Sequence, residues 1–154
     1  MIPELIHRLN EQHIEHTVVP HRRTQTAAAE ADAVGVTTHE VAKTVVAVTE
    51  NGYVRAVVAA ADRLDLRKLR DVLGTVEKPR LATEAELGAA YPGFELGAVP
   101  PFGGPAGDRV VVDARLAQED EVVLEAGTHA DSIKLHLRDL LALSGAQVAE
   151  IAAG

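Results

Sequence analysis

One lysine stands where a folded chain would normally place an apolar residue. Lys43 lies within the β-branched run "VAKTVVAV", and alternate side chains of a strand point to the same face. Lys43 would then share its face with Val41, Val45 and Ala47. A lysine in this place could hold a phosphate or an ester in a pocket, or protect an exposed strand edge from aggregation. The pattern alone favours neither interpretation.

A second candidate is the segment "GAVPPFGG", which has no hydrophobic periodicity and almost no polar side chains. Its candidate pocket residues are Gly97, Val99, Pro100, Pro101, Phe102, Gly103 and Gly104. The two prolines fix their own φ and restrict their neighbours, so the strip is rigid. The glycines permit a positive φ and the close approach of a ligand, and the phenylalanine could form a wall. A tight connection to the strand at Arg109 is the competing interpretation.

The third candidate is the segment "EAGTHADS", where one strand ends and another begins. Gly127, Thr128 and His129 follow the first strand, and Ser132 opens the second. A histidine and a hydroxyl beside a glycine bend are typical of a polar cluster at a pocket mouth. A solvent-exposed turn histidine is the alternative, and the pattern alone favours that alternative.

Several classes of site and of location are not expected. The chain of 154 residues has no Cys, and its seven His have no metal-ligand spacing, so we expect neither a metal nor a cofactor. The G-x-S-x-G, Rossmann and P-loop motifs are absent. The net charge of −8 argues against a general nucleic-acid coat and against DNA as a partner. Without a signal peptide or a long apolar run, we expect a cytoplasmic protein with no membrane partner.

The elements that must position these residues are short and mixed. Asn51-Gly52 between two β-branched runs predicts a hairpin. Helices are expected at 2–13, 26–34, 65–73, from the capping box Thr83/Glu86, and at the segment "RDLLALSG"; further strands are expected at "HTVVPH", "RVVVDARL", "EVVLEAG", "SIKLHL" and "QVAEI". We therefore expect a single α+β domain over residues 1–154, with a mixed, mostly antiparallel, barrel-like sheet and packed helices. Its core must be aliphatic, because the chain has only two Phe, two Tyr and no Trp.

Taken together, the three segments resemble the YbaK/EbsC family of aminoacyl-tRNA deacylases, which includes the editing domain associated with prolyl-tRNA synthetase. The resemblance rests on "VAKTVVAV", then "GAVPPFGG", then "VVVDARLAQEDEVVLEAGTHADSIKL", and it covers most of the chain. Lys43 matches the family's lysine, the family's G-x-x-x-P loop matches 97–101, and its late strand-end motif matches Gly127 and His129. Thr44 follows the lysine where some branches of the family carry an amide residue.

The resemblance implies a barrel-like editing domain that hydrolyses the ester of a mischarged tRNA carrying a small amino acid, without metal. It implies catalytic roles for Lys43, Gly127 and His129, and substrate contacts from Thr44, Thr128 and the 97–103 loop. The implied partner is the acceptor end of aminoacyl-tRNA, and a synthetase is a further candidate partner. We interpret the loop as a gauge that rejects larger side chains, because a hydrophobic pocket discriminates one methylene by only about 1–3 kcal/mol. A non-catalytic binding module for an amino-acid-like ligand or a synthetase is the alternative function.

Overall fold

The structure of the chain is a computed structural model, and it describes residues 2–104 and 107–154. Its helices are α1 (Ile2–Glu11), α2 (Ala27–Val34), α3 (Leu66–Leu73), α4 (Glu84–Ala90) and α5 (Leu137–Ser144), with a short 3₁₀ turn η1 (Leu116–Gln118). Its strands are β1 (His16–Pro20), β2 (Val41–Thr49), β3 (Gly52–Ala59), β4 (Arg80–Leu81), β5 (Arg109–Asp113), β6 (Glu121–Thr128), β7 (Asp131–His136) and β8 (Gln147–Ala149).

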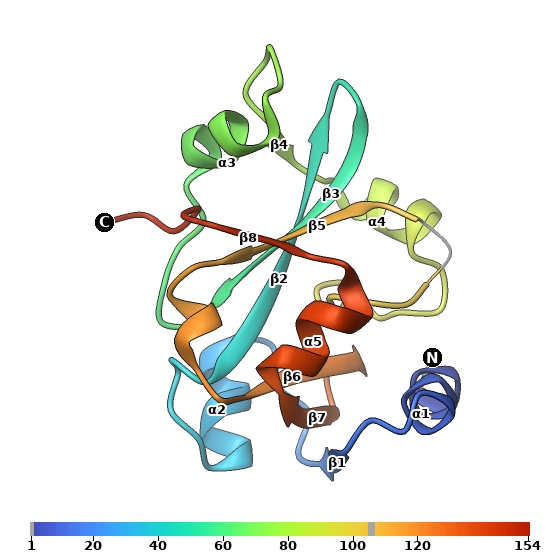
Figure 1. The fold of residues 1–154 in the computed structure, drawn as a ribbon. Coiled ribbons are helices and arrows are strands. Elements are labelled where there is room, and N and C mark those ends of the chain that lie inside the picture. Colours follow the sequence, from blue (N-terminus) through green and yellow to red (C-terminus); the bar gives the residue numbers. More distant parts are fainter. Residues whose placement is uncertain (1, 105–106) are drawn as a thin grey trace.

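The described strands form one mixed sheet in the order β1-β7-β6-β2-β3-β5-β8, with β4 added beside β2. The pairs β1/β7, β6/β7, β2/β3 and β2/β4 are antiparallel, whereas β2/β6, β3/β5 and β5/β8 are parallel. Figure 1 shows the long β2–β3 hairpin running through the middle of the molecule, with α5 packed beside it. The expected α+β architecture is confirmed.

Local signals in the sequence account for most of the helix ends and turns. The Asn51-Gly52 hairpin is confirmed, because β2 and β3 pair up to Thr49 and Gly52. Thr26 caps α2, whose end is formed by a left-handed Gly35, and Thr83 opens α4 through a full capping box. Some boundaries differ from the prediction. Helix α1 stops at Glu11, and the run "RVVVDARL" leaves the sheet after Asp113, where the chain turns into η1.

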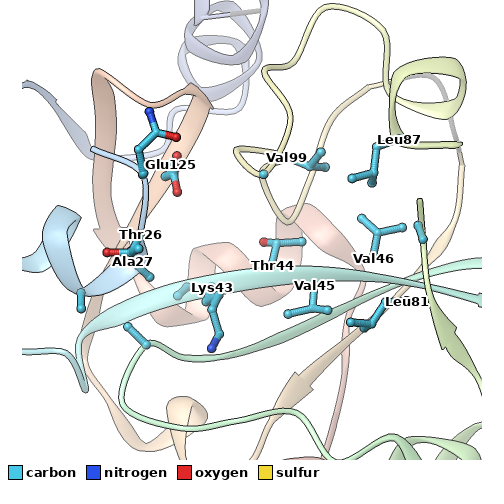
Figure 2. Close-up of a pocket in the computed structure, with 16 residues that line it drawn as sticks. Thr26, Ala27, Lys43, Thr44, Val45, Val46, Leu81, Leu87, Val99 and Glu125 are labelled. Carbon is cyan, nitrogen blue, oxygen red and sulfur yellow. The ribbon is translucent and has the colours of Figure 1, made fainter. Parts of the chain in front are cut away.

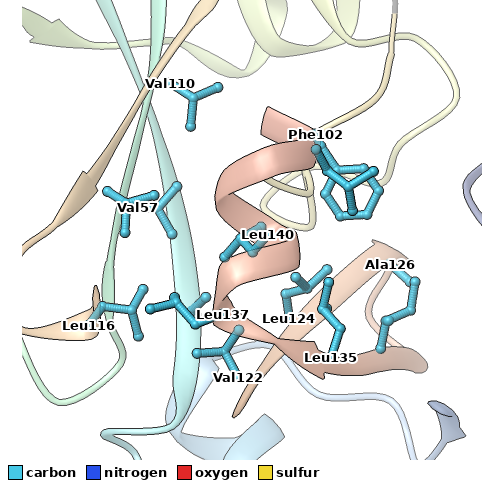
Figure 3. Close-up of a cluster of buried hydrophobic side chains, with 14 of the residues drawn as sticks. Val57, Phe102, Val110, Leu116, Val122, Leu124, Ala126, Leu135, Leu137 and Leu140 are labelled. Atoms are coloured by element: carbon cyan, nitrogen blue, oxygen red, sulfur yellow. The ribbon is translucent and has the colours of Figure 1, made fainter. Parts of the chain in front are cut away.

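The main core is aliphatic, as expected from the composition. It lies between the sheet and helices α1 and α5, and Figure 3 shows Val57, Leu124, Leu135 and Leu140 converging there. Among the described residues that are buried in this cluster, Phe102 is the only aromatic one. Strands β2 and β6 carry the candidate site. Their pairing within the sheet and their packing on this core hold them in place.

No helix within the described residues is both long enough and apolar enough to cross a membrane.

Candidate functional site

The site is a cavity of about 500 Å³ at the free edge of β2. It is bounded by the start of α2, by β2, by β4 and α4, by the loop around Gly97, and by Glu125 of β6 (Figure 2). Most lining side chains are apolar, and the polar ones are Gln25, Thr26, Lys43, Thr44 and Glu125. A volume of this size and an apolar wall with a few polar groups are typical of a small-ligand site.

The cavity exists because two neighbours of β2 leave a gap between them. Strand β6 pairs with β2 only at Val41 and Ala42, and β4 pairs with it only at Ala47 and Val48. Between these pairings, no described strand covers this edge of β2. The carbonyl of Val46 accepts a hydrogen bond from Ala82 on this edge. Because backbone groups alternate in direction along a strand, Thr44 must direct its own N–H and C=O into the gap.

Lys43 lies on one side of this strand edge and Thr44 on the other, as Figure 2 shows. The Lys43 ammonium donates a hydrogen bond of 3.1 Å to the backbone carbonyl of Asp62. An ammonium has three donors, so two remain for a ligand. Both interpretations that the sequence left open therefore apply to Lys43, because it lies on a strand edge and also lines a cavity.

The start of α2 adds a second source of positive potential on the wall of the cavity. Thr26, Ala27 and Ala28 line the cavity, and the Thr26 hydroxyl accepts a hydrogen bond from Ala29 N–H. The free N–H groups at a helix start carry a partial positive charge. The cavity therefore has two sources of positive potential, Lys43 and the start of α2.

The proline loop contributes less lining than the sequence predicted. Gly97 and Val99 line the cavity, whereas Pro100, Pro101, Phe102 and Gly103 are absent from its described lining. The Phe102 ring is 2% exposed and packs in the main core. The Val99–Pro100 and Pro100–Pro101 bonds are trans. Pro101, Phe102 and Gly103 instead line a separate, smaller hollow beside Arg55 and Asp108.

A buried arginine fastens this loop, and sequence reasoning missed it. Arg55 of β3 donates to the carbonyls of Pro100 (2.7 Å) and Gly103 (2.6 Å). Its Nε donates to Asp108 at 3.0 Å, and both side chains are at most 4% exposed. The Tyr91 hydroxyl also donates to Asp108, at 2.5 Å. Burial and this carboxylate raise the pKa of Tyr91, so its hydroxyl stays protonated and remains a donor. An arginine inside "YVRAVVAA" was the available signal.

His129 lies behind the wall of the cavity and joins three segments. Its Nε2 lies 2.7 Å from the Leu96 carbonyl, its N–H donates to Glu95, and its own carbonyl accepts from Thr24. It is 6% exposed and is absent from the described lining. A Cβ placed on Gly97 would lie 3.5 Å from the His129 ring. His129 thus supports the position of Gly97, which does line the cavity.

The other two strand-end residues also lie outside the described lining of the cavity. Gly127 has a φ of +92°, and a Cβ there would lie 2.8 Å from the Phe94 ring, so glycine is required by both backbone and space. The Thr128 hydroxyl donates to Asp131 and accepts from Ala130 N–H inside the β6–β7 turn. The structure therefore brings together Lys43, Thr44, Gly97 and Val99, and sets Gly127, Thr128 and His129 behind them.

Glu125 is the acidic residue of the lining, and sequence reasoning overlooked it. Burial, followed by the charges of Glu30 and Glu95, raises its pKa to about 8. Its Oε2 lies 2.8 Å from His129 Nδ1, which is an ion-pair distance when the imidazole is protonated, although neither atom has a hydrogen-bond partner among the described residues. Because Leu96 O can only accept, Nε2 of His129 carries a proton. The signal in the sequence was a lone acid inside "EVVLEAG".

The raised pKa of Glu125 makes the stability of the protein depend on pH. Between the ordinary carboxyl pKa of 4.5 and about 8, the unfolded chain has lost a proton that the folded chain keeps. The free energy of unfolding therefore falls as the pH rises through this range, and Glu30, whose pKa is also raised, adds to the fall. Glu125→Gln removes one of the two contributions. We expect its free energy of unfolding, measured by urea titration, to fall less steeply than that of the wild type between about pH 5 and 8.

The matched control is Glu4→Gln, at an exposed position of α1. This variant should follow the wild-type pH profile. Parallel profiles for wild type and Glu125→Gln would show that Glu125 ionises normally in the folded protein.

Among the described residues, no three His, Asp or Glu side chains converge in a way that could hold a metal ion.

Comparisons with known proteins place the chain in a family. Residues 21–143 match the model of the aminoacyl-tRNA editing domain. The crystal structure of "a putative trans-editing enzyme for prolyl tRNA synthetase" is 31% identical, with a TM-score of 0.87, over 99% of this chain and 97% of that one. The structure of the hypothetical protein APE2540 is 24% identical, with a TM-score of 0.88, over 97% of this chain and 99% of that one, and supports the fold.

A third structure comes from work on epitope grafting onto scaffold proteins. It is 27% identical, with a TM-score of 0.85, over 99% of this chain and 95% of that one. No curated protein sequence matches the chain. The family match covers the strand edge at Lys43, the loop at Gly97 and the strand end at Glu125, which are the segments that enclose the cavity. The chain belongs to the aminoacyl-tRNA editing domain family.

Proposed function

We propose that residues 1–154 form one trans-editing deacylase domain, which hydrolyses the ester of a mischarged tRNA carrying a small amino acid. It would work in the cytoplasm, where tRNA is charged, and a synthetase that supplies the tRNA is a candidate partner. The observation that carries this proposal is the cavity at the free edge of β2. Its lining joins a lysine and a helix start to an apolar wall around Val99.

The two sides of the strand edge suit the two parts of an aminoacyl ester. Lys43 and the start of α2 would hold the terminal nucleotide, whose phosphate and ribose are polar or anionic. The aminoacyl group would lie on the other side, among Thr44, Val99 and Leu87. The ester carbonyl would then cross the edge beside Thr44, whose N–H points into the gap. Backbone N–H groups and cations stabilise the oxyanion that forms when an ester is attacked.

The reaction needs only water as co-reactant. A water adds to the ester carbonyl, the bond between that carbon and the ribose oxygen breaks, and a proton passes to the ribose oxygen. The products are the free amino acid and a tRNA with a free terminal hydroxyl. We propose that the neighbouring ribose hydroxyl of the substrate assists the proton transfer, and that Gly127 and His129 act by holding the cavity wall in place.

The reaction is proposed to need no metal. Deacylation should therefore keep its full rate in excess chelator, whereas a rate that falls in chelator and returns with a divalent ion would contradict this part of the proposal.

A non-catalytic binding module is the alternative function. A protein that binds a non-hydrolysable aminoacyl-adenosine analogue in this cavity, yet releases no amino acid from any charged tRNA, would be such a module.

The size limit of the cavity gives a prediction at Val99. Val99 lines the aminoacyl side, and Arg55 fixes the next residue through its carbonyl. Val99→Ala removes two methyl groups from a wall that cannot collapse inward. We compare kcat/KM for the best-cleaved small ester with kcat/KM for an ester that is one or two methylenes larger. We expect the preference for the small ester to fall by about tenfold in this variant. Steady-state deacylation of both charged tRNAs measures this ratio.

Pro101→Ala is the companion variant, because Pro101 stiffens the loop without lining the cavity. It should change the same ratio less than Val99→Ala does. If both variants keep the substrate ranking of the wild type, the loop does not set the size limit.

A further inference from the structure

The cavity contains an acidic group that the proposed reaction, as described above, does not use. The Glu125 side chain is 14% exposed and lines the cavity from β6. Its buried Oε2 lies 2.8 Å from His129 Nδ1, but neither of its oxygens takes part in a hydrogen bond within the described residues. A buried polar atom without a partner costs about 1–3 kcal/mol, so such an atom at a cavity wall calls for an explanation.

The surroundings of Glu125 are acidic, and its one ion-pair contact within the described residues is with His129, which is a cation only when it is protonated. Glu30 of α2 and Glu95 of the 91–104 loop both lie close enough to act on its ionisation. Glu30 is 1% exposed, and its Oε1 also lacks a partner. Arg23 is bound to Glu95, and no hydrogen bond or ion pair within the described residues joins it to Glu125. No ion pair joins Glu125 to Lys43 or to any other described lysine or arginine.

The cavity therefore has a cation and an acid on different sides of the edge of β2. Lys43 lies on one side of that edge, and Glu125 lies on the other side, together with Thr44 and Val99 (Figure 2). A ligand that suits this arrangement carries negative charge near Lys43, a cation near Glu125, and a short apolar group beside Val99. Burial and the two neighbouring acids make Glu125 costly to ionise, and an arriving cation would remove part of that cost.

An aminoacyl ester has these three features. Its nucleotide carries the phosphate, and its α-amino group is a cation attached to the carbon beside the ester carbonyl. We infer that Glu125 binds the α-amino group of the aminoacyl ester, and that the site therefore requires a substrate whose amino group is free. This inference rests on the proposed deacylase function. It narrows the substrate class to esters with a free amino group, because N-acylated esters such as peptidyl-tRNA would be rejected.

The role of His129 follows from the same geometry. Its Nδ1 lies beside Glu125 Oε2, and its Nε2 is held by the Leu96 carbonyl. The His129 ring thus lies against the Oε2 side of the carboxyl group and leaves the other side for the cavity. His129 is a positioning residue in this account, since it is buried behind Glu125 and Gly97.

The test changes the enzyme and the substrate together. Wild type and Glu125→Gln are each assayed on the best-cleaved aminoacyl-tRNA and on the same tRNA after N-acetylation of the amino acid. In the wild type, we expect N-acetylation to lower kcat/KM by about 10- to 100-fold, as for loss of a hydrogen bond to a charged group. Glu125→Gln should lose a similar factor on the free amino ester. In this variant, N-acetylation should lower kcat/KM by less than about threefold, because the amino cation that acetylation neutralises has already lost its carboxylate partner.

Three other outcomes have distinct meanings. If N-acetylation costs wild type and Glu125→Gln the same factor, Glu125 does not bind the amino group. If wild type cleaves both substrates equally well, the inference fails without use of the variant, whether or not the variant folds. If wild type cleaves neither substrate, nor any other charged tRNA, the proposed function itself fails, and this inference fails with it.

The matched control is Glu121→Gln, on the same strand but with its side chain 47% exposed and outside the described lining. It should behave as wild type on both substrates. Thermal unfolding of both variants checks that any loss of rate is not a loss of folded protein.

Discussion

Replacing Arg55 by methionine is expected to lower the free energy of unfolding by about 3–5 kcal/mol. The substitution keeps much of the side-chain volume but removes the guanidinium that is held between Asp108 and the loop carbonyls. Asp108 is 4% exposed, so its charge would be left buried without its main partner. The carbonyls of Pro100 and Gly103 would lose their donors as well. Urea unfolding at neutral pH measures this loss.

The control is Arg80→Met, which breaks another two-pronged arginine–carboxylate pair, with Glu86. The Arg80 side chain is 57% exposed, so water replaces its partner and the midpoint of unfolding should hardly change. A loss at Arg55 no larger than that at Arg80 would mean that the buried network does not fasten the loop. Arg55→Lys separates charge from shape, because a lysine cannot reach two carbonyls and a carboxylate at once.

Replacing Lys43 by methionine is expected to lower kcat/KM for deacylation by about 10²–10³-fold, with the fold unchanged. Methionine keeps the apolar stem that packs along the edge of β2 and removes the ammonium. The loss of the bond to the Asp62 carbonyl should cost little stability, since the bond is partly exposed. Single-turnover deacylation and thermal unfolding, measured on the same preparation, separate the two effects.

Lys43→Arg is the companion variant, because it keeps a cation at the same strand edge. It should retain more activity than Lys43→Met, with a larger change in KM than in kcat if the lysine holds the nucleotide. Should Lys43→Met unfold more easily while cleaving at the wild-type rate, the lysine would be a strand-edge residue with no part in the reaction.

The sequence predicted most of the elements because their signals are local. The Asn51-Gly52 turn, the cap at Thr26 and the capping box at Thr83 each depend on residues within one turn of chain. Strand β4 was missed, since two residues at Arg80 and Leu81 carry no periodicity. It matters for the site because it covers one end of the free edge of β2.

The candidate site was predictable only in part, for the same physical reason. Lys43 and Val99 could be selected because a lysine in an apolar strand and a valine in a proline loop are locally unusual. Glu125 and Arg55 are defined by long-range contacts, with His129 and with the 100–103 carbonyls. Phe102 was expected at the pocket wall, but it packs in the core, because an exposed aromatic ring gains more from burial among the leucines. A local pattern does not say on which side of a loop a side chain lies.

The most direct test of the account is a deacylation panel with the wild-type protein. It is incubated with tRNA charged with alanine, serine, threonine, cysteine or proline, in excess chelator, and release of the amino acid is followed over time. The account predicts rapid hydrolysis of one ester with a small side chain, and little hydrolysis of the larger ones. Failure to hydrolyse any of these esters, with or without the chelator, by a protein shown to be folded, would contradict the assignment as a deacylase.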